Sequence, residues 1–267
     1  MSRHRSLPHA REAGVRTRKR LSQNFLTDTG IARAIVRASG VGADDLVVEI
    51  GPGAGILTRE LVGCRRLLAY EKDPGYAALL RDRYLDDPRI RCYHMDFRAA
   101  PVPREPFAVV ANIPFGSSTD ILRWCLAARR LTSATLLTQL EFARKYAGAY
   151  GRWTRLSVGQ WPWLTMELGP KVSRFAFDPV PRVDAGVLLL RRRPEPLLPM
   201  ADFRYYRRTV ELGFSGVGGS LARSLRRGYP AGVVRDACAA AGIDADMPVG
   251  LVAPDSWLTL YRKLRGR

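Results

Sequence analysis

The chain has 267 residues, of which 46% are hydrophobic, so it can form one large domain with a sizeable core and one smaller domain. Its formal net charge of +18 favours a polyanionic partner, most often nucleic acid, although a general bias toward arginine is an alternative explanation. No apolar run is long enough to span a membrane, and the basic N-terminal stretch lacks the apolar segment of a secretory signal. We therefore expect a cytoplasmic protein without membrane contacts.

The positive charge is concentrated at the two ends of the chain. Residues 1–20 hold seven basic side chains and one acidic one, and residues 191–267 hold fourteen basic and seven acidic ones. Their net charges are +6 and +7, so the 170 residues between them supply only +5. The middle of the chain is thus typical of a globular body, and its ends are typical of basic appendages.

The cysteine pattern argues against two kinds of stabilised domain. The four cysteines are scattered, at positions 64, 92, 125 and 238, and they form no CxxC pair. Neither a disulfide framework nor a zinc site has the spacing that it requires. We therefore expect a reduced compartment and no metal site.

Apolar patterning predicts alternating helices and strands after an aperiodic arm at residues 1–20. The elements expected in chain order are a helix at 29–39, a strand at 46–50, a helix at 56–62, a strand at 67–70, a helix at 76–84, strands at 90–94 and 107–111, a helix at 119–128 and a strand at 134–140. Two later strands, at 163–168 and 183–190, are expected to pair with each other. This alternation is typical of a mostly parallel sheet.

A charged segment that contains prolines, at residues 191–196, predicts a linker. Short helices are expected beyond it at 203–214, 221–226, 233–241 and 256–264. The sequence therefore divides into a basic flexible arm at 1–20, an α/β domain at 21–193 and a small helical domain at 194–267.

A glycine-rich run, GPGAG at residues 51–55, directly follows the first expected strand. Glycines at the carboxyl end of a strand let the backbone approach a ligand closely. The spacing is GxGxG, so the GxGxxG fingerprint of dinucleotide sites is not met. The run predicts a site for a nucleotide-like ligand, and a tight strand–helix turn is the alternative.

Two carboxylates follow the next two strands. Glu71 comes about 20 residues after the first glycine of the run, where a carboxylate can accept hydrogen bonds from ribose hydroxyls. Asp96 follows the third strand, where a carboxylate can accept one from an adenine amino group. Taken alone, Glu71 is compatible with a solvated acid and Asp96 with a turn residue. Suitable residues at three successive strand ends favour a nucleoside site.

The run NIPF, at residues 112–115, ends the fourth strand at the same expected sheet edge. Pro114 favours an extended Ile113, so the Asn112 amide oxygen and a nearby carbonyl can face one external amine. The amine of a nucleobase is a weak nucleophile because its lone pair is delocalised into the ring, and two acceptors can aim that lone pair at a methyl donor. Phe115 can stack on the base. A proline turn with a core phenylalanine is the alternative.

Two further segments can complete this site. Phe177, in the run FDPVP before the last strand, can contact the target base, or it can be a core residue. Residues 18–26, RKRLSQNFL, join a basic run to polar and apolar residues just before the first helix. This segment can fold over the ligand, and a solvated arm is the alternative.

As a set, these residues resemble the Erm family of 23S rRNA adenine-N6 methyltransferases, which gives resistance to macrolide, lincosamide and streptogramin B antibiotics. The matching pieces, at 22–26, 49–55, 71, 96, 112–115 and 177–183, span roughly residues 18–190. The resemblance implies that residues 21–193 form a Rossmann-like S-adenosyl-L-methionine-dependent methyltransferase domain of the α/β class. It also implies that the helical domain binds RNA, and we expect a monomer that acts on 23S rRNA.

The resemblance also implies roles for individual residues. The cofactor S-adenosyl-L-methionine would be bound by Gln23, Asn24, Leu26, Gly51, Gly53, Gly55, Glu71, Asp96 and Asn112. The target adenine would be held by Asn112, Phe115 and Phe177.

One motif distinguishes this chain from the nearest relatives of that family, the small-subunit rRNA adenine dimethyltransferases. Those enzymes typically have Asn-Leu-Pro-Tyr, whereas this chain has Asn-Ile-Pro-Phe, which favours the Erm family. Phe115 keeps the stacking face but lacks a phenol hydroxyl. A small-subunit enzyme and a non-catalytic RNA-binding protein on the same fold stay as alternatives, and Gly51, Asp96, Asn112 and Phe115 together argue against the latter. The choice between one methyl group and two stays open.

The charged ends lead to a first testable prediction. If they bind phosphates, RNA affinity falls steeply with salt, because each neutralised phosphate releases counterions with a log–log slope of about −0.7 on single strands. Deleting residues 1–17 removes four arginines and one glutamate, so the slope should flatten while cofactor affinity stays unchanged. RNA affinity measured at several salt concentrations for both proteins checks this prediction. An unchanged slope contradicts it.

Overall fold

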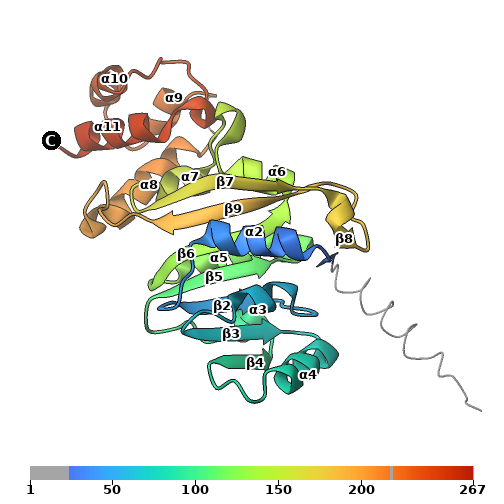
Figure 1. Cartoon of the computed structure of the whole chain (residues 1–267). Coiled ribbons are helices and arrows are strands. Elements are labelled where there is room, and N and C mark those ends of the chain that lie inside the picture. Colours follow the sequence, from blue (N-terminus) through green and yellow to red (C-terminus); the bar gives the residue numbers. More distant parts are fainter. Residues whose placement is uncertain (1–23, 217–218, 267) are drawn as a thin grey trace, which may run out of the picture. The chain divides into compact units, whose positions relative to one another are not determined.

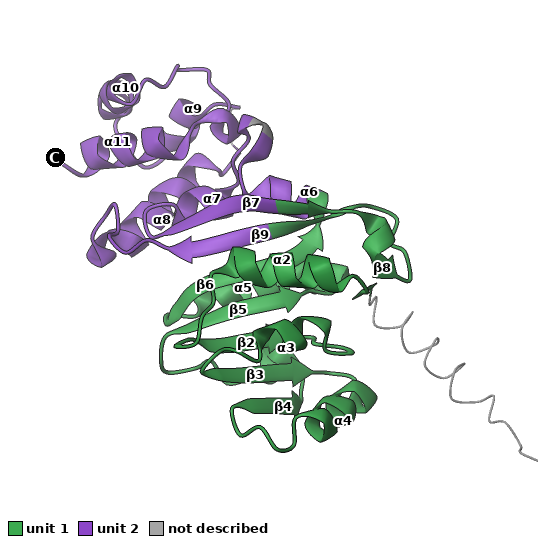
Figure 2. Ribbon diagram, viewed as in Figure 1, with its two compact units in different colours: residues 1–140, 170–187 green, residues 141–169, 188–267 purple. Residues whose placement is uncertain are grey.

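The computed structural model describes residues 24–216 and 219–266 (Figure 1). The basic arm expected at 1–20 and the expected cofactor residue Gln23 lie outside the described residues. The chain forms two compact units, Met1–Leu140 with Pro170–Val187 and Glu141–Gly169 with Leu188–Arg267, which Figure 2 colours green and purple. Along the described ranges, every helix is too short or too polar to cross a lipid bilayer.

The first unit is built on parallel strands, as the alternating pattern predicts. They are β2 (Leu46–Ile50), β3 (Arg66–Glu71), β4 (Ile90–His94), β5 (Phe107–Asn112) and β6 (Leu131–Gln139). β2 pairs in parallel with β3 and β5, β3 pairs with β4, and β5 pairs with β6. The full sheet has the order β4-β3-β2-β5-β6-β9-β7, in which the late strands β7 (Leu164–Val172) and β9 (Ala185–Arg192) are neighbours as expected.

The helices of the first unit alternate with its strands, and aspartate side chains cap two of them. They are α2 (Thr29–Ser39), α3 (Ile56–Leu61), α4 (Pro74–Arg83) and α5 (Ser118–Ala127). The Asp28 carboxylate caps α2 by accepting from the Ile31 amide at 3.0 Å, and Gly40 ends that helix with a φ of 70°. Asp73 caps α4 in the same way, with Pro74 in the first turn.

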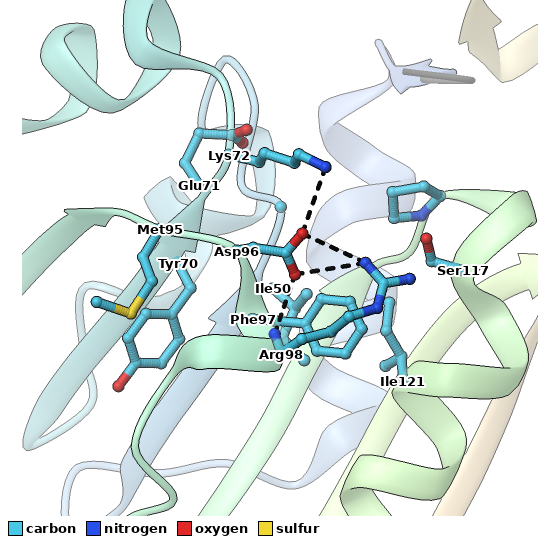
Figure 3. A pocket seen from close by; sticks show the side chains of 12 residues that line it. Ile50, Tyr70, Glu71, Lys72, Met95, Asp96, Phe97, Arg98, Ser117 and Ile121 are labelled. Atoms are coloured by element: carbon cyan, nitrogen blue, oxygen red, sulfur yellow. Dashed lines mark hydrogen bonds and ion pairs between the residues drawn. The ribbon is translucent and has the colours of Figure 1, made fainter. Parts of the chain in front are cut away.

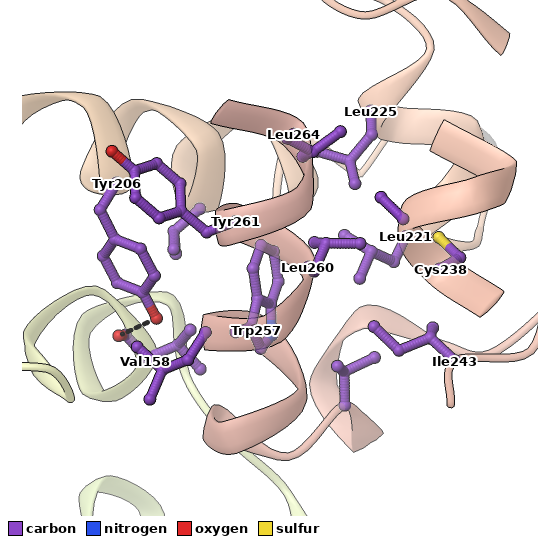
Figure 4. Close-up of a cluster of buried hydrophobic side chains, with 14 of the residues drawn as sticks. Val158, Tyr206, Leu221, Leu225, Cys238, Ile243, Trp257, Leu260, Tyr261 and Leu264 are labelled. Atoms are coloured by element: carbon purple, nitrogen blue, oxygen red, sulfur yellow. Dashed lines mark hydrogen bonds between the residues drawn. The ribbon is translucent and has the colours of Figure 1, made fainter. Parts of the chain in front are cut away.

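The second unit is mostly helical, and it also holds residues 164–169 of β7 and 188–192 of β9. Its helices are α6 (Leu140–Tyr146), α7 (Arg155–Gln160), α8 (Phe203–Gly213), α9 (Leu221–Leu225), α10 (Ala231–Ala240) and α11 (Pro254–Arg265), of which α6 starts at the last residue of the first unit. Aromatic rings meet edge to face in its core, with centroids 5.7 Å apart for Trp163 and Tyr206 and 5.2 Å apart for Tyr206 and Tyr261. The Tyr206 hydroxyl donates to the Val158 carbonyl at 3.2 Å (Figure 4).

The two compact units divide the chain differently from the boundary expected at residues 193 and 194, which stays a prediction. Residues 141–169 belong to the second compact unit and not to the first. The reason is packing, because Val158 and Trp163 are buried in the same cluster as Tyr206 and Trp257.

The apolar pattern did not predict α6 or α7, which are short, nor the two-residue strands β1 (Phe25–Leu26) and β8 (Phe177–Asp178). The single-turn 3-10 helices are η1 (Phe97–Ala99), η2 (Phe115–Ser117), η3 (Ala149–Gly151), η4 (Arg174–Ala176), η5 (Met200–Asp202) and η6 (Val249–Leu251).

The close packing of the second unit generates a stability prediction. A Cβ atom on Gly213, at the end of α8, would lie 2.4 Å from the Trp257 ring and 2.6 Å from the Leu221 side chain. We expect Gly213→Ala to lower the free energy of unfolding by about 1–3 kcal/mol, because overpacking outweighs the better helix propensity of alanine. Urea unfolding of the purified variant measures the change.

A matched control is Gly232→Ala in α10, where the nearest atom to the new methyl group is 3.9 Å away. Here we expect no loss, or a gain of up to ~1 kcal/mol from helix propensity. Equal stability changes in the two variants would contradict the packing argument.

Candidate cofactor and substrate site

The expected site residues meet where the strand order of the sheet reverses. The chain runs outward from β2 through β3 to β4 and then returns to β5 on the other edge of β2. Gly51 follows β2, Glu71 ends β3 and Asn112 ends β5. Ligands of open α/β sheets bind in the crevice at the carboxyl ends of the strands at such a reversal.

The glycine loop, residues 51–55, has a backbone that requires its glycines. Gly51, Gly53 and Gly55 have φ values of 68°, 55° and 82°, in the left-handed region that other residues rarely adopt. A Cβ atom on Gly53 would also lie 2.6 Å from the Phe25 ring. Gly51 lines the crevice, whereas Gly53 and Gly55 line none of the three hollows described below and lie against Phe25 and Leu80.

Glu71 holds this loop in place through a hydrogen bond, a role that the sequence did not predict. One carboxylate oxygen accepts from the Gly53 amide at 2.9 Å, and the other accepts from the Asp73 amide at 2.8 Å. The side chain is buried, with 1% exposure. Desolvation raises the pKa of Glu71, and the hydrogen bonds from Asp73 and Gly53 oppose the rise. The expected contact of Glu71 with a ribose stays a prediction.

The Asp96 hollow lies beside Glu71 and is drawn in Figure 3. It is lined by Ile50, Gly51, Tyr70, Glu71, Lys72, Met95, Asp96, Phe97, Arg98, Pro114, Ser117 and Ile121. Lys72 and Arg98 each pair with the Asp96 carboxylate at 3.3 Å, and Arg98 also donates to Asp120 at 2.7 Å. Desolvation by itself raises the pKa of Asp96, but hydrogen bonds from the Arg98 amide and the Lys72 ammonium outweigh it, so the pKa is lowered. Asp96 is therefore an ionised acceptor, and its two basic neighbours were not predicted.

The Asn112 hollow shares Gly51 and Pro114 with the Asp96 hollow. It is lined by Asn24, Phe25, Gly51, Asn112, Ile113, Pro114 and Phe115. The Asn112 amide nitrogen donates to the Asn24 carbonyl at 3.0 Å. This bond orients the amide, so its oxygen is the atom that can accept a hydrogen bond from an amine. The structure thus brings Asn24, Gly51, Asn112 and Phe115 together, and their contacts with cofactor and adenine stay predictions.

A third recess, the Glu49 hollow, lies under the N-terminal strand. It is lined by Phe25, Leu26, Glu49, Gly51, Pro52, Ala54, Ile56, Leu57 and Asn112. Gly51 is common to all three hollows, so a ligand in one would adjoin a ligand in the next. Leu26 lines this hollow, and its expected contact with the cofactor stays a prediction.

Phe177 is placed differently from the other expected base contacts. It lies in β8, which pairs antiparallel with β1, and its register partner is Leu26. Its side chain is buried, with 2% exposure, and it is not among the residues that line the three hollows. The core alternative accounts for this burial, and contact between Phe177 and a base stays a prediction.

In the described part of the chain, no group of three His, Cys, Asp or Glu residues is arranged to hold a metal ion.

The fold and this crevice define a class, a Rossmann-like nucleoside-binding domain joined to a helical unit. The family model for ribosomal RNA adenine dimethylase matches residues 14–265 of the chain. An rRNA adenine N-6-methyltransferase from Streptomyces fradiae is 49% identical over 253 residues, which cover 94% of this chain and 79% of that protein. An rRNA methyltransferase from Streptomyces thermotolerans is 45% identical over 258 residues, which cover 96% and 86% of the two chains.

A solved structure agrees with these sequence matches. The crystal structure of the 23S rRNA methyltransferase ErmE superposes with a TM-score of 0.85 at 45% identity, and the match covers 90% of this chain and 99% of that one. The chain belongs to the ribosomal RNA adenine dimethylase family. It is a methyltransferase that uses S-adenosyl-L-methionine, and the expected resemblance and fold class are confirmed.

A buried acid behind the glycine loop generates a pH prediction. Burial raises the pKa of Glu49 from 4.5 to about 8, opposed by a 2.8 Å hydrogen bond from the Thr58 hydroxyl and reinforced by Glu71. The unfolded chain loses this proton above about pH 4.5, whereas the folded protein keeps it to about pH 8. The stability that Glu49 contributes is therefore lost as pH rises across this window.

We expect Glu49→Gln to gain stability relative to the wild type by roughly 1.4 kcal/mol per pH unit across that window. Glutamine is neutral, and its oxygen can still accept from Thr58. Denaturant unfolding at a series of pH values measures the difference. Glu105→Gln, at an exposed ion pair with Arg65, is the control and should run parallel to the wild type. Parallel profiles for Glu49→Gln would refute the assignment.

Proposed function

We propose that the protein transfers a methyl group from S-adenosyl-L-methionine to N6 of an adenine in the peptidyl-transferase loop of 23S rRNA. Methylation there would confer resistance to macrolide, lincosamide and streptogramin B antibiotics. The observation that carries the proposal is the Asn112 amide, which the Asn24 carbonyl orients in a hollow beside Phe115. The similarity to ErmE and to the Streptomyces enzymes supports the choice of substrate.

The residues present fit the cofactor. The glycine loop offers bare backbone at the strand end, and Glu71 and Asp96 offer carboxylate oxygens in the adjoining hollow. We assign the nucleoside part to Glu71 and Asp96, and the remainder to Asn24, Leu26, Gly51, Gly53, Gly55 and Asn112, with Gln23 as a further candidate. When bound, S-adenosyl-L-methionine supplies an electrophilic methyl group on a sulfonium centre.

Asn112 and Phe115 act on the target base in this proposal. The Asn112 oxygen accepts a hydrogen bond from the adenine amine, which favours a pyramidal nitrogen with its lone pair aimed at the methyl donor. An amide is too weak a base to remove the proton, so the contribution of Asn112 is positional and electrostatic. Phe115 stacks on the base and restricts its rotation. Phe177 is assigned as a further contact, reached through β8.

RNA binding in this proposal uses the basic segments of the chain. The helical segment 194–267 is assigned as the RNA-binding domain, because the chain from residue 191 to 267 carries a net charge of +7. We further propose that the enzyme acts as a monomer in the cytoplasm, where ribosomes are assembled in bacteria.

The experiment that tests the substrate is a primer-extension map on ribosomal RNA from cells with and without the gene. We expect one gene-dependent stop, at an adenine of 23S rRNA. A stop in 16S rRNA would support the small-subunit alternative, and unchanged maps for both RNAs would support the non-catalytic one.

The assignment of Asn112 leads to a prediction about turnover. We expect Asn112→Ala to lower single-turnover methyl transfer by about 100-fold or more, since one preorganised polar group contributes on this scale. Asn112→Asp keeps an acceptor oxygen but loses the donor to Asn24, so it should lie between the alanine variant and the wild type. Radiolabelled cofactor measures the rates, and thermal unfolding controls for folding. Near-normal transfer by Asn112→Ala would refute the assigned role.

A further inference from the structure

One aromatic ring near the site is exposed to solvent without an evident structural role. Phe175 lies in η4, and 73% of its surface is exposed to solvent. Its neighbours Val172 and Phe177 are buried, each with 2% exposure. Leaving a phenylalanine ring in water forgoes the free energy that its burial would provide. A single exposed apolar side chain is ordinary at a protein surface, so the backbone and the cation around Phe175 decide what the ring can do.

The backbone under Phe175 is held by a set of hydrogen bonds. The Thr27 amide and hydroxyl donate to the Ala176 carbonyl at 2.9 and 3.0 Å. The Arg174 amide donates to the Asp184 carboxylate at 3.1 Å, and the Phe175 amide donates to the Ser173 hydroxyl at 3.4 Å. The ring is thus presented to solvent by a fixed turn, which lowers the entropy cost of binding.

A cation accompanies the ring. The Arg174 guanidinium lies 5.0 Å from the centroid of the Phe175 ring. Its Nη1 donates to the Arg182 carbonyl at 3.3 Å, which holds the group over the ring. A guanidinium has five N–H donors, so this bond leaves capacity for a phosphate. A flat apolar face beside an anchored cation matches a nucleotide, which carries a base and a phosphate.

The platform, Phe175 with Arg174, is connected to the candidate methylation site through a short path. η4 leads directly into β8, which pairs with β1, and Phe25 of β1 lines the Asn112 hollow. Asn24, the residue before β1, orients the Asn112 amide. Figure 1 shows β8 on the side of the sheet toward which β3 and β5 point, the side that holds the site.

We propose that Phe175 and Arg174 form a binding site for an unpaired nucleotide that flanks the target adenine in the RNA. The ring stacks on the base of that nucleotide, and the guanidinium binds its phosphate. The inference rests on the proposed function, because it assumes that RNA enters the Asn112 hollow. The charge of +18 favours RNA over a second copy of this basic chain as the occupant.

The test uses an RNA stem–loop that carries the target adenine in a single-stranded segment. RNA affinity is measured by fluorescence anisotropy for the wild type, Phe175→Tyr, Phe175→Leu and Phe175→Ala. We expect the tyrosine variant to bind normally and the leucine and alanine variants to lose about 5-fold or more, the lower end of what one base–aromatic stack contributes. Leu85→Ala, which removes a side chain that is 79% exposed elsewhere, is the matched control and should bind normally.

A second arm of the test identifies the nucleotide. Abasic residues replace each neighbour of the target adenine in turn, and the affinities are compared in a double-mutant cycle with Phe175→Ala. We expect the two losses to overlap at one position and to add at the others. Cofactor affinity and thermal unfolding should not change in any Phe175 variant, because the side chain is exposed.

Normal affinity of Phe175→Leu, or additive losses at every position, would overturn the inference. A concentration-dependent dimer in light scattering that Phe175→Ala abolishes would overturn it in favour of a second copy. A failure of the proposed function can be told apart from a failure of this inference. The first would appear as absence of 23S rRNA methylation by the wild type, whereas the second appears in RNA affinity, which is measured without methyl transfer.

Discussion

The site depends on one buried carboxylate that joins the ends of two neighbouring strands. Glu71, at the end of β3, accepts from the Gly53 amide after β2 and from the Asp73 amide before α4. Burial makes these bonds strong and makes their loss costly, because an unpaired carboxylate or amide would be left away from water. The lack of a Cβ atom lets the three glycines of the loop adopt left-handed φ values, and this carboxylate fixes the Gly53 amide among them. The shape of the cofactor crevice follows from that constraint.

The N-terminal segment of the described chain performs a second joining role. Phe25 covers Gly53 and packs against Tyr76 with ring centroids 5.2 Å apart, while the preceding Asn24 carbonyl orients the Asn112 amide. The same segment pairs with β8. The segment from Asn24 to Thr27 therefore contacts the glycine loop, the Asn112 amide and the turn that presents Phe175. In the proposed function, cofactor binding and base positioning share this segment.

Electrostatics in the crevice are local and differ from the strongly basic character of the chain. Glu49 and Glu71 are buried acids whose pKa values are raised by desolvation, whereas Asp96 is paired with Lys72 and Arg98 and has a lowered pKa. A carboxylate that stays ionised can accept hydrogen bonds at all physiological pH values. Repulsion from the neighbouring Glu71 adds to the effect of burial in raising the pKa of Glu49. The net positive charge instead resides mainly at the chain ends, where it can attract RNA without altering the crevice.

The sequence by itself determined the alternation of strands and helices, and with it the placement of Gly51, Glu71, Asp96 and Asn112 at strand ends. These features follow from local periodicity and turn chemistry, which neighbouring residues encode. Only the tertiary structure decided that Glu71 braces Gly53, that residues 141–169 pack with the C-terminal helices, and that Phe177 is buried. It also decided the bond between Asn24 and Asn112, which are 88 residues apart. Such contacts depend on which surfaces meet after folding, and no local pattern records the partner.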